Sequence, residues 1–300
     1  MKIVLALGGN ALTTRKDFSY KEQEKQFGRT ARIIADLIEK KHKLIITHGN
    51  GPQVGSILLQ NEAFPKTEMP LDVCGAESQA QIGYMLQQAL QNEFLRRKIK
   101  KDVCTIVTEV FVDKNDPAFK HPTKPIGPFY SKKESIKFKN KYTLKLINGK
   151  GYRRVVASPQ PKEILQLKQI KDLSEKAIVI CCGGGGIPII ESYGKIKGAA
   201  AVIDKDGCAA LLSKKLKADL LLILTDVDAV YKNYKGFGQE KLKQLNISKA
   251  KALIAEGQFG EGSMKPKVQA GINFGKKTII TSIQKAERAL DGKAGTEIIK

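Results

Sequence analysis

Three strand-like apolar runs in this chain end in glycine-rich loops. Lys2–Leu7 leads to Gly8-Gly9-Asn10, Lys43–Thr47 leads to His48-Gly49-Asn50-Gly51, and Ala177–Cys182 leads to Gly183–Gly186. Each loop is expected to open into a helical pattern. A loop without side chains lets backbone N–H groups approach an anion closely, and a helix N-terminus adds partial positive charge. Three such loops therefore predict a cleft that holds phosphate groups.

The strand-like runs alternate with helical patterns along most of the chain. Helices are expected over 20–40, 53–62, 77–98 and 207–216, another is expected to end within 171–176, and further strands are expected over 102–112 and 219–225. Alternating strands and helices of these lengths predict an α/β fold with a mainly parallel sheet covered on both faces.

Residues 114–150 interrupt this alternation. The segment contains Pro117, Pro122, Pro125 and Pro128, followed by a lysine-dense stretch over 132–145. It is too long for an ordinary connection, so it predicts a protruding subdomain or lid. No internal repeat or low-complexity linker separates the flanking parts, and the chain is expected to form one domain with two lobes.

Composition argues against several classes of protein. The longest apolar runs fall short of the roughly 20 residues that cross a bilayer, so no membrane partner is expected. The apolar start, Met1–Leu7, is too short for a signal peptide and is expected to be a buried strand of a cytoplasmic protein. The five cysteines and three histidines lack zinc-site spacing, which favours reduced cysteines packed as small hydrophobic side chains.

The formal net charge of +22 raises the question of nucleic acid. The lysines are spread along the chain among carboxylates, and no basic run is interleaved with stacking aromatic residues. The charge pattern therefore favours anionic small substrates and nucleotides, and no nucleic-acid partner is expected.

Two familiar nucleotide-binding motifs do not fit the chain. The P-loop pattern GxxxxGK[ST] is absent from the sequence. Gly49-Asn50-Gly51 with Gly55 matches the dinucleotide-binding fingerprint only weakly, because Gly55 comes one place late.

Lysines arrive from separate loops near the predicted cleft. Val202-Ile203-Asp204-Lys205-Asp206 precedes a helix, Leu222–Asp228 is a buried-strand run ending in carboxylates, and Gly262–Lys267 is a small-residue turn with lysines. Open α/β sheets place ligands where strands end. Phosphoryl transfer needs cations and backbone amides around a charged transition state more than covalent chemistry from the protein. The set therefore predicts phosphoryl transfer, with lysines neutralising phosphate oxygens and an aspartate orienting the lysines.

These motifs together resemble the carbamate kinases of the amino acid kinase superfamily. The resemblance rests on Ala6–Leu12, Ile46–Gly55, Leu71–Ala76, Pro122–Pro128, Val202–Asp206, Leu224–Val227 and Gly262–Lys267, and runs in order from residue 3 to Gly295-Thr296. It implies a three-layer αβα sandwich, a homodimer, and reversible transfer between ATP with carbamate and ADP with carbamoyl phosphate. The expected direction is ATP synthesis in arginine or carbamoyl phosphate catabolism. Mg²⁺ would be held through the nucleotide phosphates, with no metal site made of protein ligands.

The resemblance also assigns roles to residues. Catalytic roles fall on Lys205, Asp206, Lys267 and Lys124, with Lys124 reaching in from a subdomain over about 113–155. The phosphate and carbamate cradle is expected at Gly8, Gly9, Asn10, Gly49, Asn50 and Gly51, and the nucleotide site at Thr225, Asp226, Val227, Tyr231 and Met264. Residues 1–165 would form the carbamate lobe and residues 166–300 the nucleotide lobe.

One position separates carbamate kinases from their relatives. Acetylglutamate kinases, aspartokinases and uridylate kinases generally carry lysine where this chain has Ala6, and Lys124 would supply the missing cation.

The chain departs from the family pattern at Lys265, Gly207 and Glu77, and Lys265 is expected to point into solvent. Two alternatives stay open: a kinase for another small acid, against which Ala6 argues, and a regulator that binds nucleotide without turnover, against which the intact lysines argue.

Overall fold

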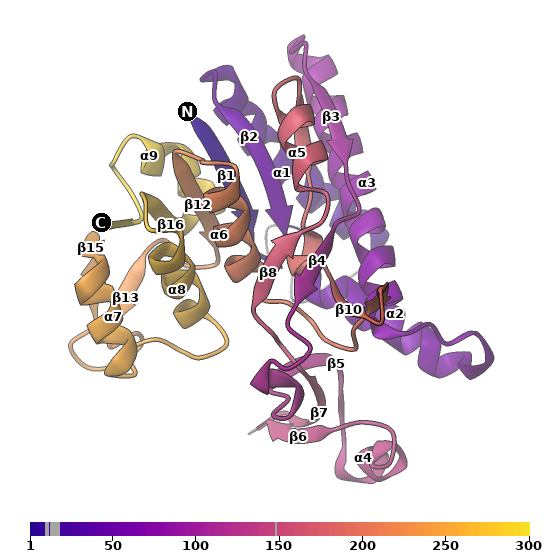
Figure 1. Cartoon of the computed structure of the whole chain (residues 1–300). Helices are drawn as coiled ribbons and strands as arrows, with labels where there is room; N and C mark the ends of the chain where they lie inside the picture. The colour runs from indigo at the N-terminus through magenta and orange to yellow at the C-terminus, as the bar shows by residue number, and fades with distance from the viewer. Residues whose placement is uncertain (10–11, 13–18, 148) are drawn as a thin grey trace.

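The computed structural model describes residues 1–9, 12, 19–147 and 149–300. Its largest sheet has eight strands in the order β15-β17-β16-β12-β1-β2-β9-β3 (Figure 1). These strands are β1 (Lys2–Leu7), β2 (Lys43–His48), β3 (Asp102–Thr105), β9 (Ala177–Ile180), β12 (Leu220–Thr225), β15 (Gln244–Asn246), β16 (Thr278–Ser282) and β17 (Thr296–Ile299). Neighbouring strands are parallel except β16 and β17. The predicted α/β class with a mainly parallel sheet is confirmed.

Helices cover both faces of this sheet. One face carries α1 (Tyr20–Glu39), α3 (Leu71–Arg97) and α9 (Ala286–Leu290), and the other carries α5 (Leu167–Ser174), α6 (Lys205–Lys215), α7 (Ile247–Ala255) and α8 (Met264–Phe274). Successive side chains of a strand point to opposite faces, so both faces of a covered strand are apolar. In β1, Ile3 and Leu5 pack under α1 and α3, while Val4 and Ala6 pack under α6 and α8. This alternation produces the three-layer αβα arrangement.

The segment expected to protrude forms a small sheet of its own, below the main body in Figure 1. Its antiparallel strands are β5 (Lys124–Tyr130), β7 (Gly151–Val156) and β6 (Leu144–Ile147), with α4 (Lys132–Phe138) and the 3₁₀ turn η3 (Pro117–Phe119) beside them. Ile126 and Val156 pack against Val54 and Leu58 of α2 (Gly51–Ala63) in a separate hydrophobic cluster. The short turn η2 (Pro65–Thr67) joins α2 to α3. The subdomain therefore has an apolar root on the main body.

Two further sheets complete the described part of the chain. One has the order β11-β10-β4-β8, and the other pairs β13 with β14. Their strands are β4 (Glu109–Val112), β8 (Pro161–Ile164), β10 (Ile187–Ser192), β11 (Lys195–Gly198), β13 (Val230–Lys232) and β14 (Glu240–Leu242). Short 3₁₀ turns are η4 (Gly183–Gly185) and η5 (Ile283–Lys285).

The single strand predicted over 102–112 is wrong, because the structure divides it into β3 and β4. β3 pairs with β9 in the large sheet, whereas β4 pairs with β10 and β8 in the second sheet. The break lies at Thr108, whose backbone N–H donates to Gln79 Oε1 and whose C=O accepts from Gln79 Nε2. Gln79 lies far away in the sequence, on α3, so local hydrophobicity could not reveal the crossover.

The third glycine loop also departs from expectation, because it does not open into an α-helix. Gly183–Gly185 forms η4 and the chain then enters β10. The loop packs against the second loop: a β-carbon on Gly183 would lie 2.5 Å from the His48 ring, and one on Gly184 would overlap the Asn50 amide. These glycines permit close approach between loops, so the anion-binding argument from a helix N-terminus does not apply here.

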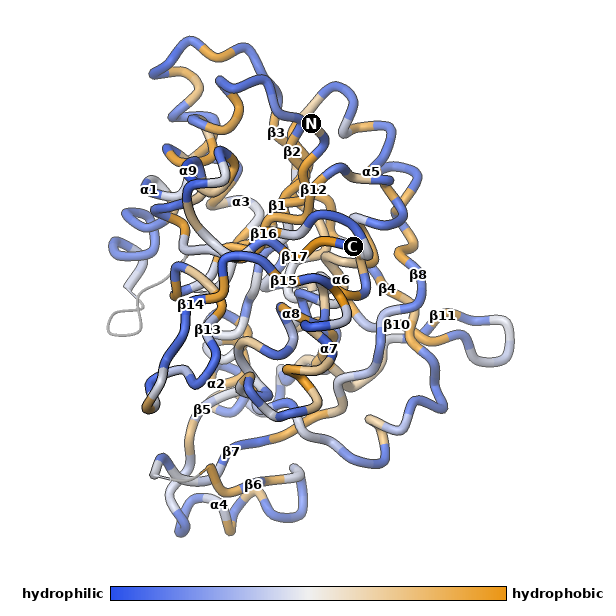
Figure 2. Tube along the Cα trace, turned by 90° about the vertical axis from the view of Figure 1, so that its left-hand side faces the viewer, coloured by the Kyte–Doolittle hydropathy of each residue, from blue (hydrophilic) through white to orange (hydrophobic). Residues whose placement is uncertain are grey.

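Hydrophobicity follows this architecture. Figure 2 shows the apolar residues concentrated along central strands such as β1, β2 and β12, with hydrophilic residues in the surrounding loops.

The helix predicted over 77–98 is α3, which begins six residues earlier than predicted, at Leu71. Among the described residues, no helix combines the length and apolar character needed to cross a bilayer.

Candidate active site

The site is built where four neighbouring parallel strands end. β12, β1, β2 and β9 lie side by side, and their carboxyl ends lead to Thr225, Gly8, Gly49 and Gly183. Open α/β sheets bind ligands along this edge. The Gly8 N–H donates to Leu224 O at 2.9 Å, and a β-carbon on Gly8 would lie only 2.8 Å from that oxygen. Glycine at this position therefore lets the first loop close onto the end of β12.

Two lysines from different helices meet at one carboxylate. Asp204 caps α6, and Lys205 and Asp206 are the first residues of that helix. The Lys205 ammonium donates to Asp206 Oδ1, and Lys267 Nζ, from the first turn of α8, lies 3.2 Å from Asp206 Oδ2. Lys267 Nζ also donates to Ser263 O at 3.0 Å. Asp206 thus contacts both ammonium groups, one with each carboxylate oxygen.

Burial and neighbouring charge act in opposite directions on the pKa of Asp206 and of Lys205. Asp206 is only 3% exposed, and this burial alone would raise its carboxyl pKa. The ammonium groups of Lys205 and Lys267 outweigh burial and lower the pKa of Asp206 to about 2. Burial, with Lys267 nearby, lowers the pKa of Lys205, and Asp206 opposes that shift. An anionic phosphate in front of the lysines would find cations already oriented.

The lysines open onto a cleft of about 850 Å³. All five residues predicted to bind nucleotide line it, together with the glycines of the first loop and both lysines: Gly8, Gly9, Lys205, Thr225, Asp226, Val227, Tyr231, Met264 and Lys267. This volume is in the range of small-molecule and cofactor sites. The structure thus brings together predicted residues separated by more than 250 positions in the sequence.

The cleft also has walls that sequence reasoning missed. Tyr234, Gln258 and Phe259 line it. Tyr234 packs against Tyr231 with ring centroids 5.8 Å apart. Aromatic residues form only 6% of the chain, so two tyrosines three positions apart after the Asp226–Asp228 segment were an available signal. Phe259 and Gln258 precede the Gly262–Lys267 turn, and only the fold carries them to the cleft.

Asp228 holds one side of this cleft. Its Oδ1 accepts from the Tyr231 hydroxyl at 2.7 Å, and its Oδ2 accepts from Lys241 and Lys285 at 2.8 Å each. Hydrogen bonds from Lys241, Lys285 and Tyr231 lower the pKa of Asp228, while the bond to Asp228 raises the pKa of Tyr231 to about 12. Asp228 thereby ties the β12–β13 turn to β14 and η5.

The second glycine loop lies beside the first but does not line the 850 Å³ cleft. A β-carbon on Gly49 would lie 3.4 Å from Lys205 Cδ and 3.6 Å from Gly9 N. Asn50, the N-cap of α2, donates from Nδ2 to Ser78 Oγ at 2.8 Å, and Gly51 begins the helix. The predicted cradle residue Asn10 lies outside the described residues. Gly49 thus places the second loop against the lysine-bearing helix.

His48 packs at the contact between the second and third glycine loops. Burial lowers the pKa of His48 to about 4, so its imidazole is neutral near pH 7. Its Nδ1 lies 3.0 Å from Gly49 O, and a carbonyl only accepts, so Nδ1 carries the proton. His48 therefore acts as a neutral packing group between the second and third loops.

Lys124 reaches the main body at α6 without lining the cleft. Its Nζ donates to Asp204 Oδ2 at 2.7 Å, and the side chains of Lys124 and Asp204 are 35% and 29% exposed. Lys124 therefore lies next to the cap of the helix that carries Lys205 and Asp206.

The residues that depart from the family pattern lie where their side chains, or the lack of one, cause no steric conflict. Lys265 Nζ pairs with the exposed Glu261 at 2.6 Å, and Lys265 does not line the cleft. A β-carbon on Gly207 would meet nothing within 4 Å, and Glu77 is exposed. Ala6 is fully buried in the apolar cluster under α6. These observations agree with the expected outward direction of Lys265.

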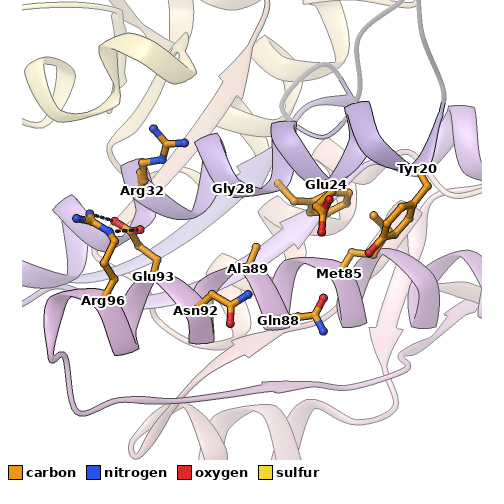
Figure 3. A pocket seen from close by; sticks show the side chains of 11 residues that line it. Tyr20, Glu24, Gly28, Arg32, Met85, Gln88, Ala89, Asn92, Glu93 and Arg96 are labelled. Atoms are coloured by element: carbon orange, nitrogen blue, oxygen red, sulfur yellow. Dashed lines mark hydrogen bonds and ion pairs between the residues drawn. The ribbon is translucent and has the colours of Figure 1, made fainter.

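A second cleft, of about 570 Å³, lies between α1 and α3, away from the predicted site residues (Figure 3). Tyr20 and Met85 lie at one end, and Glu93 and Arg96 form an ion pair at the other. Of the predicted site residues that the structure describes, none lines this cleft.

Comparisons with known proteins agree with this architecture. The model of the amino acid kinase family matches residues 1–283. The chain is 50% identical to the carbamate kinase of Clostridium perfringens over the whole of both chains, and 45% identical to that of Pyrococcus furiosus over 99% of each. The structure of carbamate kinase from Giardia lamblia bound to AMP-PNP superposes with a TM-score of 0.93 at 44% identity, covering 100% of this chain and 98% of that one. The chain belongs to the amino acid kinase family, and within it to the carbamate kinases.

Proposed function

We propose that this protein is a carbamate kinase that interconverts ADP with carbamoyl phosphate and ATP with carbamate. The observation that carries the proposal is Asp206, a buried carboxylate that holds Lys205 and Lys267 at the edge of a nucleotide-sized cleft. In the ATP-forming direction, the phosphorus–oxygen bond to carbamate breaks and a bond from the ADP β-phosphate oxygen to that phosphorus forms. This direction would serve catabolism of arginine or carbamoyl phosphate.

The residues divide the work by location. Lys205 and Lys267 would bind the transferring phosphoryl group, and the Gly8 and Gly9 backbone would approach its oxygens. The cleft lined by Thr225, Asp226, Val227, Tyr231 and Met264 would hold the nucleotide. Gly49–Gly51 would face carbamate, and Lys124 would supply a further cation for the phosphoryl group from the protruding subdomain. On this assignment residues 1–165 form the carbamate lobe and residues 166–300 the nucleotide lobe.

We also propose that Mg²⁺ enters with the nucleotide. The described residues include no group of three or more His, Cys, Asp or Glu side chains placed to hold a metal. Mg²⁺ commonly takes phosphate oxygens and water with few protein ligands. The nucleotide phosphates would therefore be its main ligands, and the metal would offset phosphate charge beside the lysines.

The direct test is ATP formation from ADP and carbamoyl phosphate with Mg²⁺, in a coupled assay. Wild-type protein should form ATP, whereas Lys267→Ala should lose about 10²-fold in kcat, because one preorganised cation is removed. Lys265→Ala is the matched control, two residues away and paired with Glu261, and should change the KM for ADP by less than about threefold. If folded wild-type protein phosphorylated acetylglutamate or aspartate but did not use carbamoyl phosphate, the protein would instead be a kinase for another small acid.

A cytoplasmic homodimer completes the proposal. Tyr84 and Leu95 on α3 are 63% and 79% exposed, and the α1–α3 cleft lies on the same pair of helices. A second copy covering this face would remove those apolar groups from water. Sedimentation velocity should give a dimer near twice 33.0 kDa, and Leu95→Glu should shift it toward monomer. A wild-type monomer at micromolar concentration would refute the dimer.

A further inference from the structure

Asp204 touches two parts of the site at once. Its Oδ1 accepts from the backbone N–H of Asp206 at 2.9 Å and of Gly207 at 3.4 Å, which caps α6. Its Oδ2 accepts from Lys124 Nζ at 2.7 Å. One carboxylate therefore joins the protruding subdomain to the helix that begins with Lys205 and Asp206.

The backbone around Asp204 supports the same junction. Val202 N–H donates to Ala157 O at 3.0 Å, Ala157 forms a bridge with Ala201, and Val202 packs against the cluster containing Ile126 and Val156. The backbone after β7, the strand that pairs with β5, is thus joined to the residues leading into α6 independently of the Asp204 carboxylate. The capping bonds to Oδ1 fix the orientation of the Asp204 carboxylate, so its second oxygen, Oδ2, is directed at Lys124.

We propose that Asp204 is a positioning residue, which holds the Lys124 ammonium beside Lys205 for binding the phosphoryl group of carbamoyl phosphate. This inference rests on the proposed function. A lysine ammonium has three donors and no acceptor, so Lys124 can keep its bond to Asp204 while donating to a phosphate. Ordering the lysine in advance reduces the entropy lost on binding. Asp204 itself touches neither nucleotide nor phosphate.

Asp204→Asn separates the two roles of the side chain. Asparagine caps helices about as well as aspartate, but it removes the negative charge that faces Lys124. We expect the KM for carbamoyl phosphate to rise about tenfold, with kcat and the Kd for ADP within about threefold of wild type. Asp204→Glu, which retains the charge, should recover part of the loss. Asp116→Asn is the matched control and should leave KM unchanged, because Asp116 caps η3 through the Ala118 N–H and accepts from the Gln160 N–H with its other oxygen.

A double-mutant cycle tests whether Asp204 acts through Lys124. In a Lys124→Ala background, Asp204→Asn should add less than about twofold to KM, since its target is gone. An unchanged or lower KM for Asp204→Asn alone would overturn the proposal, and a lower value would mean that Asp204 sequesters Lys124. Full additivity with Lys124→Ala would overturn it as well.

A second readout does not need catalysis. Hydrogen exchange of residues 124–130 should speed up in Asp204→Asn without substrate, and remain at the wild-type rate in Asp116→Asn. Inactive wild-type protein would refute the proposed function, while this exchange difference would still show the tether. Equal exchange in wild type and Asp204→Asn would overturn the tether itself, whatever the activity.

Discussion

At the scale of single residues, Asp206 links the chemistry of the site to the stability of the fold. Its folded pKa of about 2 lies below the reference value of 3.8, so its stabilising contribution is complete above pH 4. That contribution is lost as the pH falls from about 4 to about 2. Asp206→Asn should flatten this part of the stability profile, measured by urea unfolding between pH 7 and pH 2.

The same substitution should also lower stability at neutral pH. The substitution would remove the carboxylate that pairs with Lys205 and Lys267 at this buried position, at a cost on the order of 3 kcal/mol. Asp113→Asn, at an exposed aspartate, should leave the acid profile close to wild type. An Asp206→Asn protein with the wild-type acid profile would contradict the lowered pKa.

Asp228 offers a second prediction at this scale, on the Tyr231 side of the cleft. Asp228→Asn removes the charge that Tyr231, Lys241 and Lys285 share, so the cleft wall should loosen and the KM for ADP should rise several-fold. The pKa of Tyr231 should fall from about 12 toward 10, because the bond to an anionic acceptor raised it. Ultraviolet titration, with Tyr231→Phe subtracted, measures that change. If the pKa of Tyr231 were the same in Asp228→Asn as in wild type, the bond to Asp228 would not be what raises it.

At the scale of elements, the glycine loops support one another as much as they could support a ligand. Gly184→Ala would push the Asn50 amide away from Ser78, because the added methyl group overlaps it. Misplacing a substrate-facing loop by about 1 Å can cost on the order of 10²-fold in rate. We therefore expect Gly184→Ala to lower kcat/KM at least tenfold, measured in the ATP-forming assay.

Gly194 supplies the matched control for that substitution. Its φ of +69° is close to the +65° of Gly184, but a β-carbon there would meet nothing within 4 Å. Gly194→Ala therefore carries the same backbone strain without the collision, and its kcat/KM should stay within about twofold of wild type. If both variants lost activity equally, backbone strain and not the loop contact would be responsible.

At the scale of the whole molecule, the net charge of +22 should accelerate the arrival of an anionic substrate. Lysines and arginines greatly outnumber carboxylates in residues 113–155, which border the site through Lys124. We expect kcat/KM for carbamoyl phosphate to fall several-fold as salt rises from about 10 mM to 500 mM, since screening shortens the Debye length from about 30 Å to below 5 Å. A neutral osmolyte at equal osmolality controls for viscosity and water activity. A salt-independent kcat/KM would exclude electrostatic steering.

The sequence by itself determined the layered fold and most of the site. A strand such as Lys2–Leu7 must be buried on both faces, because it is apolar from Ile3 onward, and this demands helices above and below. Strand-end motifs predicted a ligand edge, because parallel strands bring their carboxyl ends to one side of the sheet. The resemblance to carbamate kinases then assigned Thr225, Tyr231 and Lys267 to that edge, and the structure places all three around one cleft.

Tertiary structure alone decided how distant segments meet. Gln79 divides the run over 102–112 between two sheets, and the third glycine loop packs on Asn50 instead of starting a helix. Tertiary structure also decided that Lys124 pairs with Asp204, 80 positions away, and that Asp206 serves two lysines. Such contacts depend on side-chain hydrogen bonds and close approaches across long loops. Hydrophobic periodicity carries no information about them, because it reports only which face of each element is buried.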